Sequence, residues 1–186
     1  MTKNIMIVGV GGQGTLLTSR ILGGIMVDAG YDVKLSEVHG MAQRGGSVVT
    51  FVRYGEKVYE PIVEEGQADV LIAFERLEAY RYAHFLKKGG AIVVNDQRID
   101  PITVVTGAAE YPEHIIETLE KDHNVYRVDA QAMAKEMGNS KVFNIIVLYC
   151  LLRYCLFNNP KPFFFIKVHM LCGKPQNNNI KYFGIS

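Results

Sequence analysis

The sequence predicts an α/β fold in which a mostly parallel sheet carries helices on both faces and an inserted β-hairpin. Short, nearly continuous apolar runs at residues 4–8, 68–74 and 91–95 are typical of buried parallel strands. Segments with helical spacing of their apolar residues follow two of these runs, at 15–26 and 75–88. With 186 residues, the chain is long enough to bury one substantial core.

The first thirty-odd residues predict a strand, a glycine turn, a helix and a second strand (residues 31–36), which is a βαβ opening of Rossmann type. Gly9, Gly11 and Gly14 match G-x-G-x-x-G, in which the glycines permit a tight turn and a close approach of the backbone. The N–H groups at the start of the helix attract a phosphate or carboxylate.

Two interpretations of this turn stay open. In the first, the turn binds an anion, and the candidate binding residues are Gly9, Gly11, Gly12, Gln13 and Gly14. A bound dinucleotide would also need an acidic residue at the end of the second strand, where Glu37 is the only candidate. In the second, the glycines serve chain packing alone.

A glycine-rich loop follows the second strand and is a further candidate site, because loops on a rigid scaffold commonly carry function. Its candidate residues are His39, Gly40, Met41, Gln43, Arg44, Gly45 and Gly46. Residues 47–54 then predict a strand, Gly55-Glu56 a turn, and Lys57–Tyr59 the returning partner of a β-hairpin.

The rest of the predicted domain alternates strands and helices. We expect the helix at 75–88 to end at Gly89-Gly90, which resembles a C-cap. A helix after Pro112, a strand at 124–128 and a helix at 130–137 follow. Asn95 ends a parallel strand, where it could contact a ligand or simply form a turn.

The composition changes near residue 145, so we divide the chain into a domain at 1–145 and an atypical tail at 146–186. None of the 19 acidic residues lies after Glu136, whereas six of the 20 basic residues do. The tail is either a basic, aromatic docking segment or the product of a frameshift in AT-rich DNA, and we favour the frameshift.

The bulk properties exclude several classes of protein. The formal net charge is +1, and no long apolar run predicts a membrane span or a secretory signal, so we expect a cytoplasmic protein without a nucleic-acid or membrane partner. The three cysteines, at 150, 155 and 172, lack the spacing of a metal or iron–sulfur site. We therefore expect no metal site in this chain.

Three stretches together resemble the gamma-type subunit of 2-oxoacid:ferredoxin oxidoreductases, and most of all the indolepyruvate enzymes. They are Gly9–Gly14, Ser36–Gly46 and Ala68–Glu75, and Met137–Lys141 is similar to a further family stretch. The resemblance covers roughly residues 4 to 145, and the His39–Gly46 loop is its most specific part.

The resemblance implies an enzyme that oxidatively decarboxylates a 2-oxoacid to an acyl-CoA and passes electrons to ferredoxin. It implies that thiamine diphosphate and iron–sulfur clusters are held by a partner subunit, and that this chain is required but holds no catalytic residue. The glycine turn would then face the partner, the active-site mouth or a phosphate of coenzyme A, and the His39–Arg44 segment would do the same.

Two other functions remain as alternatives. A stand-alone dinucleotide-binding oxidoreductase would use the glycine turn and Glu37. An adenylating enzyme of the ubiquitin-activating type also opens with such a turn, but it needs paired C-x-x-C motifs that this sequence lacks. A role of His39 in proton transfer is less favoured than a role in shaping the loop, because no nucleophile or carboxylate pair is spaced to work with it.

Overall fold

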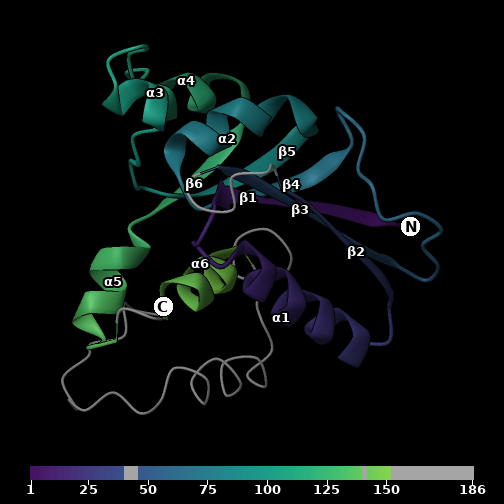
Figure 1. The fold of residues 1–186 in the computed structure, drawn as a ribbon. Coiled ribbons are helices and arrows are strands. Elements are labelled where there is room, and N and C mark those ends of the chain that lie inside the picture. The colour runs from purple at the N-terminus through teal and green to yellow at the C-terminus, as the bar shows by residue number, and fades with distance from the viewer. Residues whose placement is uncertain (40–45, 140–141, 152–186) are drawn as a thin grey trace.

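The computed structural model describes residues 1–39, 46–139 and 142–151, which form a single sheet flanked by helices (Figure 1). The six strands follow the order β2-β3-β1-β4-β5-β6. Strand β3 is antiparallel to both of its neighbours, whereas β1, β4, β5 and β6 are parallel. The strands are β1 (Lys3–Val10), β2 (Asp32–His39), β3 (Ser47–Gly55), β4 (Ala68–Ala73), β5 (Leu86–Asn95) and β6 (Asn124–Val128).

Helices cover both faces of this sheet, as the sequence predicts. Helices α1, α5 and α6 lie on one side of the sheet in Figure 1, and α2, α3 and α4 lie on the other. The helices are α1 (Thr15–Asp28), α2 (Arg76–Tyr82), α3 (Ile102–Val105), α4 (Ile115–Asp122), α5 (Ala130–Glu136) and α6 (Phe143–Leu151), with the 3-10 turn η1 (Ala83–Phe85) after α2.

The central strands are apolar throughout because each contributes to two cores. Along β1, Ile5 and Ile7 point to the core beneath α1 and α6, whereas Met6 and Val8 point to the core beneath α2 and α4. Strand β4 repeats the alternation, with Ile72 in the first core and Leu71 in the second. This double burial explains why a continuous apolar run predicts the strands correctly.

The predicted β-hairpin forms with different partners. Strand β3 pairs with β2 on one side, from Asp32 opposite Gly55 to His39 opposite Val48, and with β1 on the other. Both of its edges are therefore occupied, and Lys57–Tyr59 lie outside any strand. The prediction that Lys57–Tyr59 pair with β3 is wrong, although an antiparallel pair is indeed inserted into the sheet.

The predicted helix at 75–88 is too long. The chain leaves helical conformation after η1 and enters β5 at Leu86, so Gly89 and Gly90 lie within a strand and do not cap a helix. A side chain at Gly90 would come within 2.9 Å of Leu86 and 3.2 Å of the Ala68 carbonyl oxygen. This glycine is therefore explained by the close pairing of β5 with β4.

Helix α6 crosses the predicted domain boundary at residue 145. Its side chains Ile146, Val147 and Leu148 are at most 5% exposed and belong to the core beneath α1. Cys150 is also buried there, and its burial raises the pKa of the thiol to about 11. The chain from 152 onward, including the proposed frameshift, lies outside the described residues, and the division at 145 stays a prediction.

We expect Leu148→Ala to lower the free energy of unfolding by about 2–5 kcal/mol, because it removes a side chain that is 2% exposed from a packed core. Leu17→Ala on α1 is the matched control, since Leu17 is 53% exposed and should change stability by no more than about 0.5 kcal/mol. Urea denaturation measures both. Equal effects would show that α6 does not pack as described.

Candidate functional site

The glycine turn lies at the carboxyl end of β1. The steric reason for a glycine differs from one position of the turn to the next. A Cβ at Gly9 would come within 2.9 Å of Gln13 Oε1 and 3.2 Å of Phe74 Cβ. Gly12 and Gly14 have φ values of +98° and +83°, in the left-handed region that favours glycine. The amide of Gly11 donates a 2.8 Å hydrogen bond to the carbonyl of Gly46. Packing therefore accounts for part of the motif.

The side chain of Gln13 fixes the turn to the neighbouring strand. Its Oε1 accepts from the Val10 amide at 2.7 Å, and its Nε2 donates to the Phe74 carbonyl at 3.0 Å. The same Nε2 donates to Gln97 Oε1 at 3.0 Å. Because Gln13 is 9% exposed and its carboxamide is used internally, it holds the turn in place and is not free to contact a ligand.

Asn95 and Gln97 extend this contact across the sheet edge. Asn95 Nδ2 donates to the Phe74 carbonyl at 3.2 Å and to Gln97 Oε1 at 3.3 Å, and its Oδ1 accepts from the Ala130 amide at 3.1 Å. We call Gln13, Asn95 and Gln97 the amide cluster. Asn95 is 1% exposed, so it joins three segments of the fold and does not face a ligand at the surface.

The start of α1 has no side-chain cap. Gly14 is its N-cap and supplies no side-chain oxygen, so the first N–H groups of the helix have no side-chain acceptor at the cap. The side chain of Asn144 from α6 packs against this point, since a Cβ at Gly14 would lie 2.2 Å from Asn144 Nδ2. The binding of an anion near the positive end of this helix dipole stays a prediction.

The glycine-rich loop is described only at its two ends. His39 is the last residue of β2, and Gly46 accepts the hydrogen bond from Gly11. Five of the predicted site residues lie outside the described residues: Gly40, Met41, Gln43, Arg44 and Gly45. The structure therefore places the end of this loop beside the glycine turn, at the carboxyl end of β1.

Glu37 does not lie where a ribose-binding acid is expected. It is paired with Thr50 of β3, and Thr50 is paired with Ile7 of β1. The inserted strand therefore separates Glu37 from β1 by an additional strand spacing of about 4.8 Å. In a dinucleotide-binding fold the second strand lies directly beside the first. This strand order disfavours the stand-alone dinucleotide-binding alternative.

Two buried carboxylates on α2 were not predicted from the sequence. Glu78 is 2% exposed and accepts a short hydrogen bond from the Ser47 hydroxyl, at the end of the loop. Arg81 pairs with Glu78 at 2.8 Å, and Tyr82 Oη lies 3.0 Å from Ser47 Oγ. Burial raises the pKa of Glu78, and the bonds from Ser47 and Arg81 oppose that rise.

Glu75, the N-cap of α2, is the second of these carboxylates. It is 1% exposed and accepts from the amides of Glu78 at 3.0 Å and Ile99 at 3.2 Å. Tyr111 Oη donates to it at 2.5 Å. The sequence of a short polar helix does not indicate which of its polar residues face the interior. The burial of Glu75 and Glu78 is therefore apparent only from the tertiary packing.

Within residues 1–39, 46–139 and 142–151, no group of three or more His, Cys, Asp or Glu side chains could hold a metal ion. In the same ranges, no helix combines the length and apolar character needed to cross a bilayer.

Comparison with known proteins identifies the family. The profile of the pyruvate ferredoxin/flavodoxin oxidoreductase family matches residues 4–161. The chain is 45% identical to the indolepyruvate oxidoreductase subunit IorB of Pyrococcus horikoshii over 149 residues, which are 78% of this chain and 74% of that protein. Its counterpart in Archaeoglobus fulgidus is 45% identical over 157 residues, covering 83% and 78%. The chain therefore belongs to the pyruvate ferredoxin/flavodoxin oxidoreductase family, which confirms the predicted resemblance.

Solved structures share the fold. A keto/oxoacid ferredoxin oxidoreductase gamma subunit from Geobacter sulfurreducens has a TM-score of 0.58 at 22% identity, covering 82% of this chain and 76% of that one. A 2-oxoglutarate:ferredoxin oxidoreductase chain from Magnetococcus marinus has a TM-score of 0.61 at 21% identity, covering 84% of this chain and 25% of that one. The predicted α/β fold of Rossmann type is confirmed.

Gly14→Ala should destabilise the protein by about 1–3 kcal/mol, because it places a Cβ at a left-handed φ and against Asn144. Gly24→Ala is the matched control within α1, where a Cβ would meet no atom within 4 Å. It should stabilise the protein by about 0.4–1 kcal/mol. Thermal or urea unfolding of both variants measures the contrast, and a harmless Gly14→Ala would contradict the described packing.

The stability of the wild type should fall relative to Glu78→Gln as pH rises from 4.5, the ordinary value for Glu78, through its raised pKa. In that window the folded state binds more protons than the unfolded state, so increasing pH favours unfolding. Ser47→Ala should extend the upper end of the window to higher pH, because it removes a bond that favours the charged carboxylate in the folded state. Urea denaturation across pH measures this, and parallel profiles for wild type and Glu78→Gln would contradict it.

Proposed function

We propose that this chain is a non-catalytic but required subunit of a 2-oxoacid:ferredoxin oxidoreductase that uses thiamine diphosphate and iron–sulfur clusters. The observation that carries the proposal is the 45% identity to indolepyruvate oxidoreductase subunits along most of both chains. The substrate is indolepyruvate, pyruvate or a similar 2-oxoacid, which the complete enzyme converts to an acyl-CoA.

The chemistry of the side chains supports a division of work between subunits. Cys150, the cysteine within the described residues, is buried with a raised pKa and is a poor ligand for a cluster. We place the groups that would bind the clusters and thiamine diphosphate on the partner subunit. Thiamine diphosphate supplies the decarboxylation chemistry there, and the clusters conduct electrons to ferredoxin.

The contribution of this chain is a preformed surface at the carboxyl edge of the sheet. The amide cluster holds the glycine turn, and the Gly11–Gly46 hydrogen bond holds the end of the loop beside it. Exposed apolar side chains border this edge, namely Leu16 (39%), Leu17 (53%) and Val38 (53%). An exposed group of apolar side chains is typical of a protein–protein interface.

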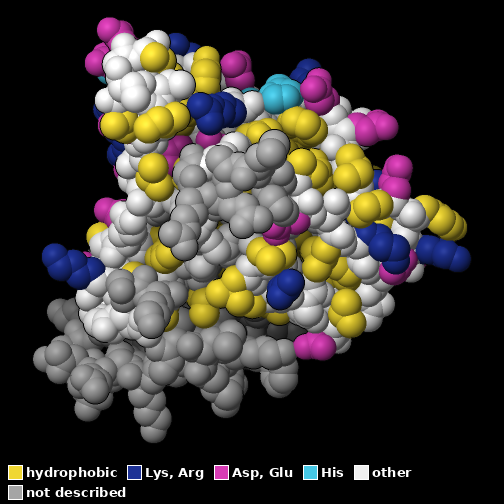
Figure 2. All heavy atoms as spheres, viewed as in Figure 1, with side chains coloured by type: hydrophobic (Ala, Val, Ile, Leu, Met, Phe, Trp, Pro, Cys, Tyr) yellow, Lys and Arg dark blue, Asp and Glu magenta, His cyan; other side chains and the backbone are white. Residues whose placement is uncertain are grey.

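On the face drawn in Figure 2, hydrophobic side chains are spread among charged and other side chains. We place the partner subunit at the glycine turn and the loop, with the start of α1 available to a phosphate of coenzyme A.

Anaerobic affinity capture of the full chain from its own cell extract tests the proposal. The captured material is assayed for 2-oxoacid-dependent dye reduction. Capture of a large, cluster-bearing partner together with activity is the expected result. Capture of the bare chain, with a nucleotide released on denaturation, would favour the stand-alone dinucleotide-binding function. The full chain is needed because truncation at 145 would remove the buried residues of α6.

Arg44→Ala and Gly45→Val should each weaken binding of the partner subunit at least about tenfold, because arginine is frequent among dominant interface residues and a valine stiffens a glycine loop. Lys88→Ala is the control, since Lys88 is exposed near the start of β5, at the opposite edge of the sheet. Biolayer interferometry and reconstituted activity measure the effects. Unchanged affinity and activity in both loop variants would refute docking through this loop.

A further inference from the structure

A hollow at the same end of the sheet carries three arginines that the proposed function does not use. Its volume is about 400 Å³, and Arg76, Arg98 and Arg127 line it together with Tyr111 and the first residues of α4. Arg76 follows β4, Arg98 follows β5 and Arg127 is in β6. The pocket therefore lies at the carboxyl ends of three parallel strands, where open α/β sheets bind ligands.

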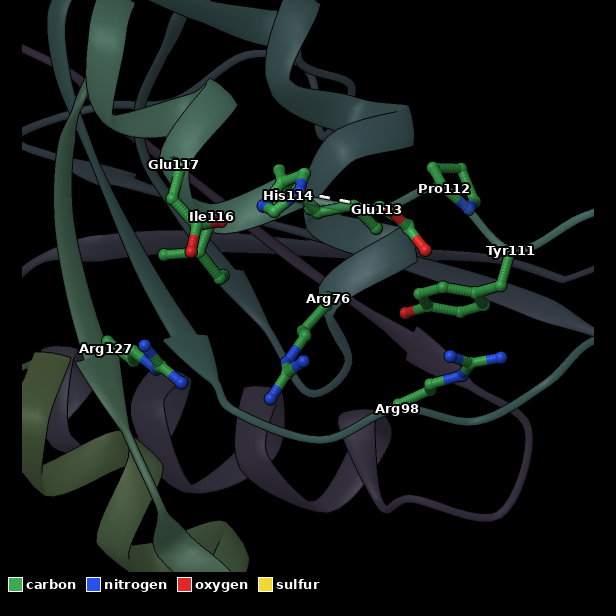
Figure 3. A pocket seen from close by; sticks show the side chains of 10 residues that line it. Arg76, Arg98, Tyr111, Pro112, Glu113, His114, Ile116, Glu117 and Arg127 are labelled. Carbon is green, nitrogen blue, oxygen red and sulfur yellow. Dashed lines mark ion pairs between the residues drawn. The ribbon is translucent and has the colours of Figure 1, made fainter.

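Carboxylates hold all three guanidinium groups in place. Asp96 binds Arg76 through Nε and Arg127 through both Nε and Nη2, and Asp100 binds Nε of Arg98 at 2.6 Å. Because a guanidinium carries several N–H groups, each arginine keeps terminal N–H groups for a further acceptor. Figure 3 shows Arg76 between Arg127 and Arg98, with the start of α4 above them. The three side chains are thus oriented before any ligand arrives.

Arg98 is further restrained by an aromatic ring. Its guanidinium carbon lies 4.3 Å from the centre of the Tyr111 ring, within the range of a cation–π contact. Tyr111 is itself fixed, because its hydroxyl donates to buried Glu75 at 2.5 Å. This chain of contacts anchors an otherwise half-exposed arginine to the interior of the domain.

The start of α4 adds to the positive electrostatic potential in the pocket. Its N-cap, His114, has a φ of +53°, makes no side-chain cap hydrogen bond and lines the pocket. Glu113 and Glu117 also line the pocket and are exposed to solvent, whereas Asp96 and Asp100 hold the three arginines. The hollow therefore combines three held guanidinium groups with two exposed carboxylates.

We propose that this pocket binds the phosphate group of a small organic ligand. Guanidinium groups match the paired oxygens of a phosphate, and three of them at fixed positions supply more donors than a single carboxylate needs. The volume exceeds that of a phosphate alone and falls within the usual range of small-molecule sites, so it also accommodates an organic remainder.

The site is separate from the glycine turn but connected to it. Gln97 bonds to Gln13 of the turn, and Gln97 is flanked in the chain by Asp96 and Arg98 of the pocket. The Arg76 amide also donates to the Gln97 carbonyl at 3.1 Å. The two sites therefore share one structural support, although the binding of a phosphate here does not depend on the proposed subunit role.

Isothermal titration calorimetry of the full chain tests this site, with inorganic phosphate and adenosine 5′-monophosphate as probes and adenosine as the matched compound without phosphate. We expect saturable binding of both phosphate-bearing probes, tighter for the monophosphate, and no binding of adenosine. Absence of saturable phosphate binding would overturn the site. A monophosphate that binds no more tightly than phosphate would overturn the assignment of the remaining volume to an organic group.

Variants of single residues identify where the probe binds. Arg98→Gln and Arg127→Gln should each weaken binding roughly tenfold, which is the usual effect of losing one charge-assisted hydrogen bond. Arg20→Gln is the control of equal charge change, since Arg20 is exposed on α1 across the sheet. An equal loss of affinity in Arg20→Gln would show that the protein's overall charge causes the effect, and it would overturn the proposal. Weaker binding in Glu113→Gln would also overturn it, because the carboxylates would then hold the probe.

Discussion

The carboxamide of Gln13 is the contact on which the functional edge of this sheet depends. It is bonded to the end of β1, to the end of β4 and to Gln97 beyond β5. Each partner is a backbone or amide group, and Asn95 also donates to two of them, the Phe74 carbonyl and Gln97 Oε1. One neutral side chain thus aligns the glycine turn with the segments that carry Asp96 and Arg98, and no ligand is needed to form the edge.

The strands and most helices could be predicted because they depend on local patterns. The apolar runs of β1, β4 and β5 and the periodicity of α1 are present in the sequence itself. Strand pairing is not a local property. The Gly55-Glu56 signal predicts a return strand at Lys57–Tyr59, yet β1 and β2 already occupy both edges of β3. Likewise, Gly89-Gly90 resembles a helix end, but close pairing of β5 with β4 explains Gly90.

The site was predictable only in part, for a related reason. A glycine motif states where the backbone must turn, so Gly9–Gly14 could be found from spacing alone. It does not state which side chain faces inward. Gln13 was expected among the binding residues and is instead buried, whereas Glu78 and Ser47 meet through tertiary packing between α2 and β3. Arg76, Arg98 and Arg127 are far apart in sequence and are assembled only by the parallel strands.

The contact between Gly14 and Asn144 has a consequence for how the chain folds. It joins the glycine turn after β1 to the last described helix, so the chain as far as residue 144 must be present before it can form. Contacts between such distant residues form slowly, since the entropy of closing a long loop is lost first. We therefore expect pairings between nearer segments, such as β2 with β3, to form before the turn acquires its final packing.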